Sequence, residues 1–310
     1  MKSIDIIVPI YNEDKCLHEL FNRLISLKNK MSSKVNISII FVDDGSVDKS
    51  VKILKKYCNR NNFCKLIILS RNFGHQIAVS AGIDHSTADY AAIIDADLQD
   101  PPELIEDMYE HLLMGYDVVY GQRVHRVGET FFKKLSAVYF YKTLSFLCNI
   151  DIPKDTGDFR IVTKRVIDEL RNMREQHRFI RGMVPWIGFK SLPLSYSRHE
   201  RFAGETKYPI SKMIAFAKNA IFSFSRKPLI FATKIGLYIT LIAFFGGLYL
   251  LYLKLFTSSV VEGVTVTVLT VILMGGLNIM ILGILGEYIA RIFEESKNRP
   301  LYIIDNKINF

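Results

Sequence analysis

Two aspartates separated by one residue, Asp95 and Asp97, directly follow the apolar run at 91–94. Alternate residues of an extended chain point to the same side, so these carboxylates can share one divalent cation at a strand end. Mg²⁺ and Mn²⁺ prefer oxygen ligands and often complete their shell with substrate phosphates. The same stretch contains Gln99, a candidate neutral ligand. These residues predict a site for Mg²⁺ or Mn²⁺ that neutralises a departing diphosphate.

Two further polar clusters stand at the ends of other apolar runs. One is Pro9-Ile-Tyr-Asn-Glu13, and the other is Asp43-Asp-Gly-Ser46. As an alternative, the acidic residues of the second cluster, together with Asp48, only form turns and helix caps. That alternative accounts well for Asp48 but poorly for three polar clusters that all follow apolar runs. The clusters therefore predict one ligand site built from several strand ends.

The elements that must position these clusters are read from hydrophobic periodicity. Apolar runs predict buried strands at 4–10, 35–42, 64–69 and 90–94, and apolar residues at helical spacing separate the first three runs. Alternation of strands and helices predicts an α/β fold with a mostly parallel sheet, which binds ligands at the carboxyl ends of its strands. GxGxxG does not follow the first strand and GxxxxGK[ST] is absent from the chain, so the two commonest phosphate-binding loops are missing.

The C-terminal part of the chain is apolar and nearly uncharged. Ile235–Leu253 and Gly263–Gly286 contain 19 and 24 residues without a charged side chain. About 20 apolar residues cross a bilayer as a helix, which satisfies every backbone polar group internally. A pair of buried core helices is the alternative, but core helices rarely run this long without charge. The two runs and the short connector at 254–262 predict a transmembrane hairpin.

Lysines and arginines flank the outer ends of this hairpin, whereas its connector holds only Lys254 and Glu262. The positive-inside rule predicts an integral protein of the inner or plasma membrane with both termini in the cytoplasm. We expect a cytoplasmic catalytic domain at 1–228, two spans within 229–291 and a cytoplasmic tail at 292–310. Glycines in the second span permit close helix contact, so a homo-oligomer stays an open alternative.

The formal net charge of +9 is unevenly distributed. Residues 1–122 carry 13 basic and 17 acidic side chains, residues 123–228 carry 21 and 9, and the remainder carries 6 and 5. We expect the basic middle to face membrane lipids with anionic headgroups and a phosphate, rather than nucleic acid. Two stretches in it, at about 131–147 and 210–224, are typical of amphipathic helices lying on a membrane; solvated helices on the catalytic domain are the alternative.

Cysteine and histidine spacing adds no site of its own. The four cysteines form no CxxC pair, and free cytosolic thiols are the simplest interpretation. The histidines show neither HxH nor HExxH spacing, so no catalytic or metal-binding role is assigned to His75 or to any other histidine.

Several motifs resemble those of family 2 glycosyltransferases, which have the GT-A fold, a Rossmann-like nucleotide-sugar domain. These motifs are VPIYNE (8–13), VDDGS (42–46), SRNFGHQIAVSAGID (70–84) and DADLQDPPE (95–103). Later stretches are similar to polyprenyl-phosphate glycosyltransferases, a group with dolichol-phosphate mannose synthase and bacterial undecaprenyl-phosphate glucosyltransferases. They are GQRVHR (121–126), TGDFR (156–160), HRFIRGMVPWIGF (177–189) and RFAGETKYP (201–209). The QxxRW motif of processive polymer synthases is absent.

The resemblance implies inverting, metal-dependent transfer of a sugar from a nucleotide sugar to polyprenyl phosphate. On resemblance alone, UDP-glucose is the preferred donor and undecaprenyl phosphate the preferred acceptor. Matching positions place the base and ribose at Pro9, Tyr11, Asn12, Glu13 and Asp43, and the diphosphate and metal at Asp95, Asp97 and Gln99. The candidates for binding the acceptor phosphate or the diphosphate are basic: Arg123, Arg126, Arg201 and Lys207.

Asp158, in the TGDFR stretch, and Asp97 are the predicted catalytic carboxylates. The resemblance places a carboxylate such as Asp158 near the attacking group, where it accepts a proton, orients an arginine or binds a sugar hydroxyl. A structural pairing with Arg160 that only holds a loop is the alternative. A phosphate acceptor is mostly ionised at pH 7, so it needs positioning more than deprotonation.

Two other functions stay open at this stage. One is glycosyl transfer to a different lipid, such as a glycolipid or diacylglycerol. The other is a non-catalytic membrane scaffold or translocation subunit built on a degenerate transferase. Intact Asp95 and Asp97 favour an enzyme, and two spans are few for a transport path.

Overall fold

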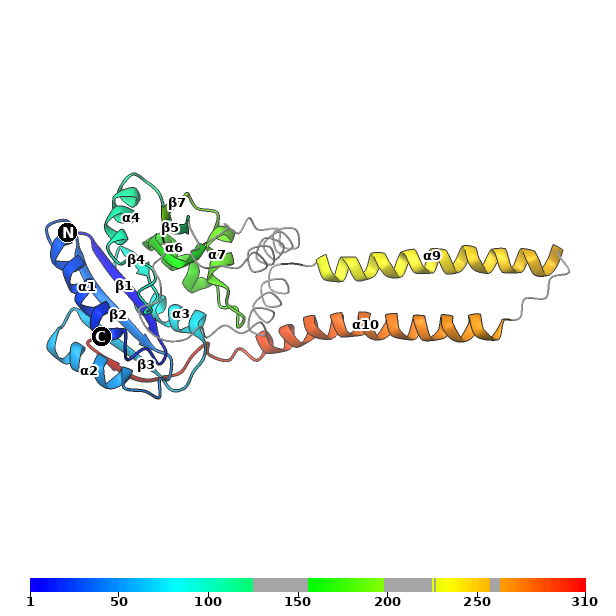
Figure 1. Ribbon diagram of the computed structural model, residues 1–310, viewed down its shortest axis with the longest axis horizontal. Helices are drawn as coiled ribbons and strands as arrows, with labels where there is room; N and C mark the ends of the chain where they lie inside the picture. Colours follow the sequence, from blue (N-terminus) through cyan, green and yellow to red (C-terminus); the bar gives the residue numbers. More distant parts are fainter. Residues whose placement is uncertain (125–155, 198–224, 226, 257–262) are drawn as a thin grey trace.

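The computed structural model describes residues 1–124, 156–197, 225, 227–256 and 263–310. The predicted interfacial helices at 131–147 and 210–224 lie outside these ranges, as do Arg126, Arg201 and Lys207. The described residues form an α/β domain from which two long helices project (Figure 1).

The α/β domain is built on one sheet, whose described strands have the order β7-β5-β6-β4-β1-β2-β3-β8. Its centre consists of parallel neighbours: β4 (Tyr90–Ile93), β1 (Ser3–Ile10), β2 (Asn36–Asp43) and β3 (Cys64–Leu69). These four strands confirm the predicted ones, each to within one residue at either end. An antiparallel strand, β6 (Thr156–Thr163), separates β4 from β5 (Val118–Arg123) and β7 (Ser191–Tyr196).

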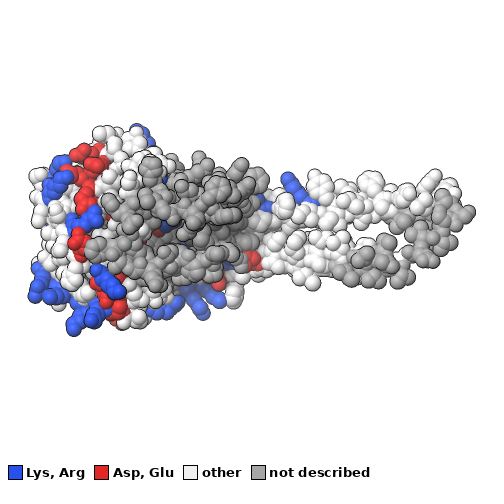
Figure 2. All heavy atoms as spheres, in the orientation of Figure 1, with Lys and Arg blue, Asp and Glu red and all other residues white. Residues whose placement is uncertain are grey.

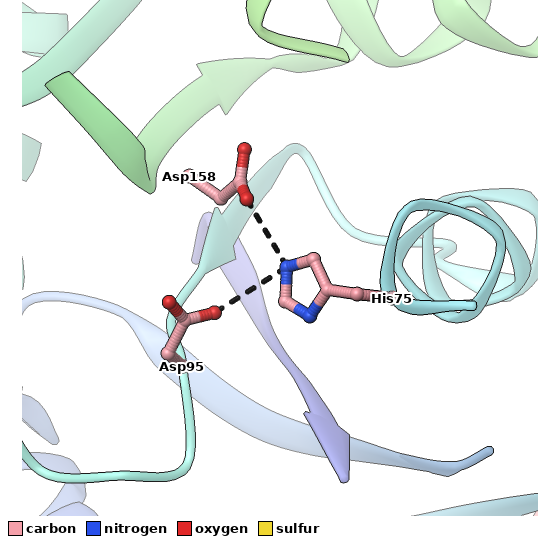
Figure 3. Close-up of side chains that lie close together, drawn as sticks. All are labelled: His75, Asp95 and Asp158. Atoms are coloured by element: carbon pink, nitrogen blue, oxygen red, sulfur yellow. Dashed lines mark hydrogen bonds and ion pairs between the residues drawn. The ribbon is translucent and has the colours of Figure 1, made fainter. Parts of the chain in front are cut away.

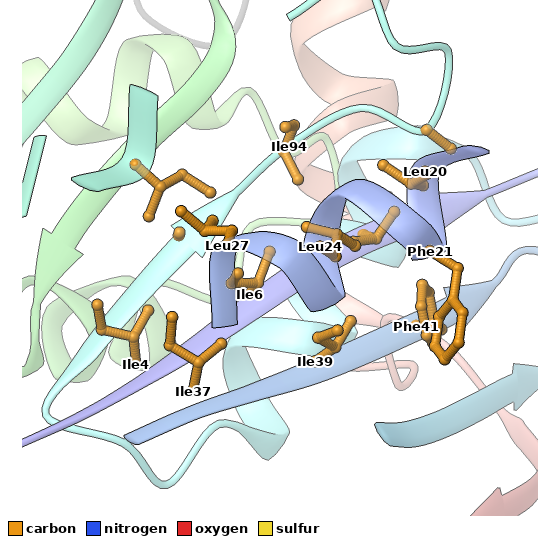
Figure 4. Packing of buried hydrophobic residues seen from close by; sticks show 14 of the residues in the cluster. Ile4, Ile6, Leu20, Phe21, Leu24, Leu27, Ile37, Ile39, Phe41 and Ile94 are labelled. Atoms are coloured by element: carbon orange, nitrogen blue, oxygen red, sulfur yellow. The ribbon is translucent and has the colours of Figure 1, made fainter. Parts of the chain in front are cut away.

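Helices cover both faces of this sheet because successive strand residues point to opposite sides. On one face, Ile4, Ile6 and Ile39 pack with buried residues of α1 (Leu17–Met31), α2 (Ser50–Arg60) and α4 (Leu104–Leu113) (Figure 4). On the other face, Ile7 and Ile40 pack with α3 (His75–His85), α6 (Lys164–Asn172) and α7 (Ile180–Ile187). A sheet buried on both faces explains why its central strands are continuous apolar runs.

The two projecting helices are α9 (Lys227–Phe256) and α10 (Val264–Ser296). Each contains a stretch long and apolar enough to cross a membrane, Lys227–Gly246 and Leu273–Ser296, of which 6% and 0% is buried inside the protein. Figure 2 shows the helices as a projection with few charged side chains, whereas Lys, Arg, Asp and Glu gather on the α/β domain. Such exposed apolar faces need an apolar partner, and the length of each apolar stretch matches the thickness of the hydrocarbon core of a bilayer.

The residues after α10 return to the α/β domain and add β8 (Ile304–Ile308), antiparallel to β3 (Figure 1). The backbone nitrogen of Ser70 also donates to the carbonyl oxygen of Ile303 at 2.9 Å. The sequence predicts only a tail here, because a short strand with exposed polar residues carries no apolar periodicity. This strand covers the edge of β3, which would otherwise present unpaired backbone groups.

Asn309 anchors the end of this tail with its side-chain amide, which donates to the backbone oxygens of Cys58 (2.7 Å) and Cys64 (2.8 Å). We expect Asn309→Ala to lower the free energy of unfolding by about 1–2 kcal/mol, because two partly buried acceptors lose their donor. Thermal unfolding of the purified protein in detergent measures this change. Asn306→Ala removes an exposed side chain from β8, just before Asn309, and is the matched control. Equal unfolding temperatures for the two variants would contradict the prediction.

Candidate functional site

The site begins where strands of opposite direction bring two carboxylates together. In the ladder between β4 and β6, Ile93 pairs with Arg160. Continuing this antiparallel register by two residues places Asp95 opposite Asp158, with both side chains on the same side of the sheet. Asp95 follows the end of β4 as the sequence predicts, but its nearness to Asp158 depends on the insertion of β6 beside β4.

His75, the first residue of α3, lies between these two carboxylates (Figure 3). Its Nε2 atom is 3.1 Å from Oδ2 of Asp158 and 3.5 Å from Oδ1 of Asp95. The chain turns into α3 at Gly74, whose φ of +103° is costly for any other residue type. Among the described residues, His75, Asp95 and Asp158 form a group of candidate metal ligands, with ligand atoms within 4.8 Å of one another.

The three side chains shift one another's pKa. Burial lowers the pKa of His75, but Asp95 and Asp158 outweigh burial and raise it to about 9. Burial raises the pKa of Asp95 to about 6 against the opposing effect of His75. Burial also opposes ionisation of Asp158, yet Arg181 and His75 hold its pKa well below the usual range. At pH 7 the imidazole is therefore cationic, and the two carboxylates beside it are mostly ionised.

Asp158 is buried and accepts hydrogen bonds from two helices of one face. Arg181 of α7 forms a two-pronged ion pair with it, at 2.9 Å from Nε to Oδ1 and 3.0 Å from Nη2 to Oδ2. Gln76 of α3 donates to Oδ2 at 3.1 Å. Arg160, the partner considered from sequence, approaches only to 3.9 Å and donates instead to backbone oxygens of its own strand. The close ionic partner of Asp158 is thus Arg181 rather than Arg160.

The two other predicted clusters meet at the carboxyl ends of β1 and β2. The backbone nitrogen of Asn12 donates to Oγ of Ser46 at 3.0 Å, and Oδ1 of Asn12 accepts from the backbone nitrogen of Val47 at 2.8 Å. Asp43 is fully buried, and its Oδ2 accepts from the backbone nitrogen of Ser46 at 3.1 Å. Its Oδ1 accepts no hydrogen bond from the described residues. A buried oxygen without a donor can accept an N–H group of a ligand.

The neighbouring aspartates have structural partners. Asp48 is the turn and cap residue that the alternative reading predicts, since it accepts from the backbone nitrogens of Asp14 and Ser50. Asp44 accepts from the backbone nitrogens of Phe73 (2.7 Å) and Gly74 (2.9 Å). These two hydrogen bonds join the end of β2, which carries Asp43, to the loop that leads into His75.

Asp97 and Gln99 lie in the turn after β4, where Oδ1 of Asp97 accepts from the backbone nitrogen of Gln99 at 3.2 Å. They do not belong to the three-residue group around His75, so their role as metal ligands stays a prediction. Pro9 lies within β1, one residue before the strand ends. Tyr11, just beyond that end, is 40% exposed. Glu13 donates through its backbone nitrogen to Oγ of Ser50.

Arg123 is the predicted phosphate-binding residue that the structure describes. Its Nη2 lies 3.6 Å from Oδ1 of Asp100, and its Nε donates to the hydroxyl of Tyr196 at 3.2 Å. The guanidinium also lies against Gly157, because a Cβ added there would stand 2.5 Å from Nη2. Arg123 therefore lies beside the residue that precedes Asp158, and Asp100 and Tyr196 hold its guanidinium there.

Sequence reasoning assigned no role to three residues of this site: His75, Gln76 and Arg181. His75 lies 83 positions from Asp158 along the chain, and Arg181 lies 23 positions from it. No local spacing joins such positions. The available signal is that all three lie inside the stretches SRNFGHQ and HRFIRG, which carry part of the resemblance.

The arrangement suits a divalent cation. Oδ1 of Asp95 is buried and accepts no hydrogen bond from the described residues, although His75 Nε2 lies 3.5 Å away. Carboxylate oxygens are ligands that both Mg²⁺ and Mn²⁺ accept, and an imidazole nitrogen is an additional ligand for a transition metal. Asp95, Asp158 and His75 can therefore hold a metal ion once the ion displaces the proton that Nε2 of His75 shares with Asp158.

Comparison with known proteins identifies the family of this chain. A family model described as glycosyl transferase family 2 matches residues 5–171. The glycosyltransferase YkcC of Bacillus subtilis is 46% identical over 96% of this chain and 92% of its own length, and the Synechocystis glycosyltransferase sll0501 is 40% identical over 98% and 95%. The prophage bactoprenol glucosyl transferase homolog of Escherichia coli is 33% identical over 97% and 98%. The chain therefore belongs to glycosyl transferase family 2 and is a glycosyltransferase of the GT-A fold.

Proposed function

We propose that this protein is a membrane enzyme that transfers a sugar from a nucleotide sugar to a polyprenyl phosphate and releases a nucleoside diphosphate. The proposed donor is UDP-glucose, and the proposed acceptor is undecaprenyl phosphate. The bactoprenol glucosyl transferase of Shigella phage SfV, 32% identical over 98% of this chain, and the homolog in Escherichia coli support this choice of reaction.

One observation carries the proposal: the carboxylate cluster of Asp95 and Asp158 belongs to a domain that is fastened to an exposed apolar hairpin. The N-terminus, and with it the start of β1, lies at the end of the domain away from the hairpin (Figure 1). The carboxyl end of β1, where a ligand binds such a sheet, therefore points toward the hairpin. An acceptor phosphate held at a bilayer surface would meet the donor on this side.

The donor is held by the ends of β1, β2 and β4 in this proposal. Asp43, with Pro9, Tyr11, Asn12 and Glu13, binds the base and ribose, and the buried Oδ1 of Asp43 accepts a base N–H. Asp95, with Asp97 and Gln99, holds a divalent metal that neutralises the diphosphate leaving group when it is bound.

The acceptor is held by basic residues of the middle segment: Arg123, Arg126, Arg201 and Lys207. Arginine forks bind phosphate oxygens in pairs and thereby fix their direction. An oxygen of the acceptor phosphate attacks the anomeric carbon opposite to the departing diphosphate, so the configuration inverts. Because this phosphate is already largely ionised at pH 7, the step needs alignment more than a base.

Asp158 serves as a positioning residue in this reaction. Both of its oxygens already bind cationic donors, Arg181 and His75, and its low pKa makes it a weak base. Its effect is to fix Arg181 and His75 beside Asp95, where the negative charges of donor and acceptor converge. Among the three roles considered from sequence, orientation of an arginine is the one that these contacts favour.

For the membrane topology, we propose that the α/β domain and both termini face the cytoplasm. Lys227 and Lys234 stand at the start of α9, and Arg291, Lys297 and Arg299 stand at the end of α10. This excess of basic residues on the domain side of the hairpin is what the positive-inside rule requires.

Radiolabelled nucleotide sugars test the reaction, each offered with undecaprenyl phosphate or with diacylglycerol, with and without EDTA. We expect label to move from UDP-glucose to undecaprenyl phosphate, and EDTA to slow the transfer about 100-fold until Mg²⁺ or Mn²⁺ is restored. Label in diacylglycerol would favour the other-lipid alternative. No release of nucleoside diphosphate with any donor would contradict the proposal, and full activity in EDTA would contradict its metal dependence.

A further inference from the structure

Residues 174–181, here called the coupler, run from the surface of the α/β domain into the site. Arg174 is exposed, Gln176 and His177 are half-buried, and residues 178–180 are buried. At the buried end, the backbone nitrogen of Ile180 donates to Oε1 of Gln76 at 2.9 Å. The next residue, Arg181, is the one that pairs with Asp158. The inner end of the coupler is therefore part of the framework that holds the site.

The outer end of the coupler binds the last turn of α10. The backbone nitrogen of Gln176 donates to Oε1 of Glu295 at 2.8 Å, and Nε2 of His177 lies 2.5 Å from Oε2 of Glu294. The side chain of Gln176 also donates to the backbone oxygen of Arg299 at 2.6 Å. One segment of eight residues thus touches both the Asp158 cluster and the end of a helix in the apolar hairpin.

The chain after α10 strengthens this attachment. The hydroxyl of Tyr302 donates to Oδ2 of Asp84 at 2.9 Å, and Arg174 of the coupler pairs with the same oxygen at 2.7 Å. Asp84 lies near the end of α3, the helix that begins with His75. The end of α10, the coupler and α3 therefore form one connected set of polar contacts around the site.

We propose that Glu294 and Glu295 are positioning residues that act through the coupler and hold the site at a fixed height and angle over the bilayer. The inference rests on the proposed function, because only an acceptor anchored in the membrane has its own fixed position relative to α10. A displacement of about 1 Å between reacting groups costs up to about 100-fold in rate. A phosphate that diffuses freely adjusts its own position, so its transfer does not depend on the contacts between the coupler and α10.

The test uses the full-length protein in bilayer nanodiscs and compares two acceptors, undecaprenyl phosphate in the bilayer and a short-chain, water-soluble prenyl phosphate. The double variant Glu294→Ala with Glu295→Ala removes both contacts with the coupler. Glu294→Gln with Glu295→Gln keeps an acceptor oxygen at both positions and is the matched control. We expect the alanine pair to raise KM for the bilayer acceptor about tenfold, whereas the glutamine pair stays within about threefold of the parent.

The second acceptor separates positioning from support of the fold. With the soluble prenyl phosphate, we expect the alanine pair to leave kcat, the KM for this acceptor and the KM for the nucleotide sugar within about twofold of the parent. Equal losses with both acceptors would mean that the contacts only support the site, and unchanged KM for both would mean that they position nothing; either result overturns the inference. Transfer to neither acceptor by the parent protein is a different result, which contradicts the proposed function itself.

A third variant keeps the test decisive if the alanine pair fails to fold, which thermal unfolding reveals. Gln176→Ala removes the bond to the backbone of Arg299 and leaves both glutamates in place. We expect it to raise KM for the bilayer acceptor about threefold and to leave the soluble acceptor unaffected. An equal change of KM for the two acceptors, each relative to the parent, would also overturn the inference.

Discussion

Replacing Asp95 by asparagine is expected to lower the rate of sugar transfer about 1,000-fold, the largest effect of any single substitution in the site. Asparagine keeps the shape of the side chain but removes its charge, which stands 3.5 Å from His75. The site then keeps the cationic imidazole and loses one of the two carboxylates that balance it. The asparagine amide also offers a divalent cation only a neutral oxygen in place of the charged one. Initial rates of nucleoside diphosphate release, together with binding of Mn²⁺ by calorimetry, measure the two consequences.

Asp89→Asn is the matched control for this substitution. Asp89 precedes the same strand at its other end, where it pairs with Lys2 at 2.8 Å on the protein surface. Removing that charge is expected to leave the transfer rate within about twofold, because exposed ion pairs contribute little and this one is remote from the site. A D95N protein that keeps more than about a tenth of the parent rate would contradict the central role of Asp95.

Asp158→Asn is expected to lower kcat about 100-fold while the affinity for nucleoside diphosphate stays close to that of the parent. The donor pocket proposed at Asp43 does not use Asp158, whereas Arg181 loses the carboxylate that fixes its guanidinium. Arg181→Ala is expected to cause a similar loss for the same reason. Single-turnover rates and calorimetric binding of nucleoside diphosphate separate the effects on chemistry and on the donor.

The double variant of Asp158 and Arg181 distinguishes positioning from base catalysis. If Asp158 acts by holding Arg181, the double variant loses no more than either single variant, because both changes break one contact. If Asp158 accepts a proton, Asp158→Asn costs far more than Arg181→Ala and the two losses multiply. Thermal unfolding must accompany the cycle, since Arg181→Ala leaves the buried Asp158 carboxylate without its close ionic partner, which destabilises the fold by about 3 kcal/mol.

The fold was predictable where its cause is local. The strands at the centre of the sheet and the two apolar helices are all continuous apolar runs. Their lengths alone tell a buried strand from a helix that can span a membrane. β6 was not predicted as a partner of β4, and β8 was not predicted at all. β8 contains Asp305, Asn306 and Lys307 in sequence, so its pairing comes from the free edge of β3 rather than from apolar periodicity.

The sequence by itself determined the α/β class, the apolar hairpin, and the polar clusters at the ends of β1, β2 and β4. Each of these depends on residue type and on spacing within about two dozen positions, which secondary structure converts directly into a side of a strand or the length of a helix. The clusters also carry the resemblance to family 2 glycosyltransferases, which the family comparison confirms.

Only the tertiary structure decided which groups meet. The order of strands places β6 antiparallel to β4, so Asp158 comes opposite Asp95, and the packing of α3 and α7 on one face brings His75 and Arg181 to the same carboxylate. The coupler and Tyr302 join the end of α10 to the framework of this site across more than a hundred residues of chain. Such contacts depend on how separate elements share one core and one sheet, and no repeat or spacing along the chain encodes that arrangement.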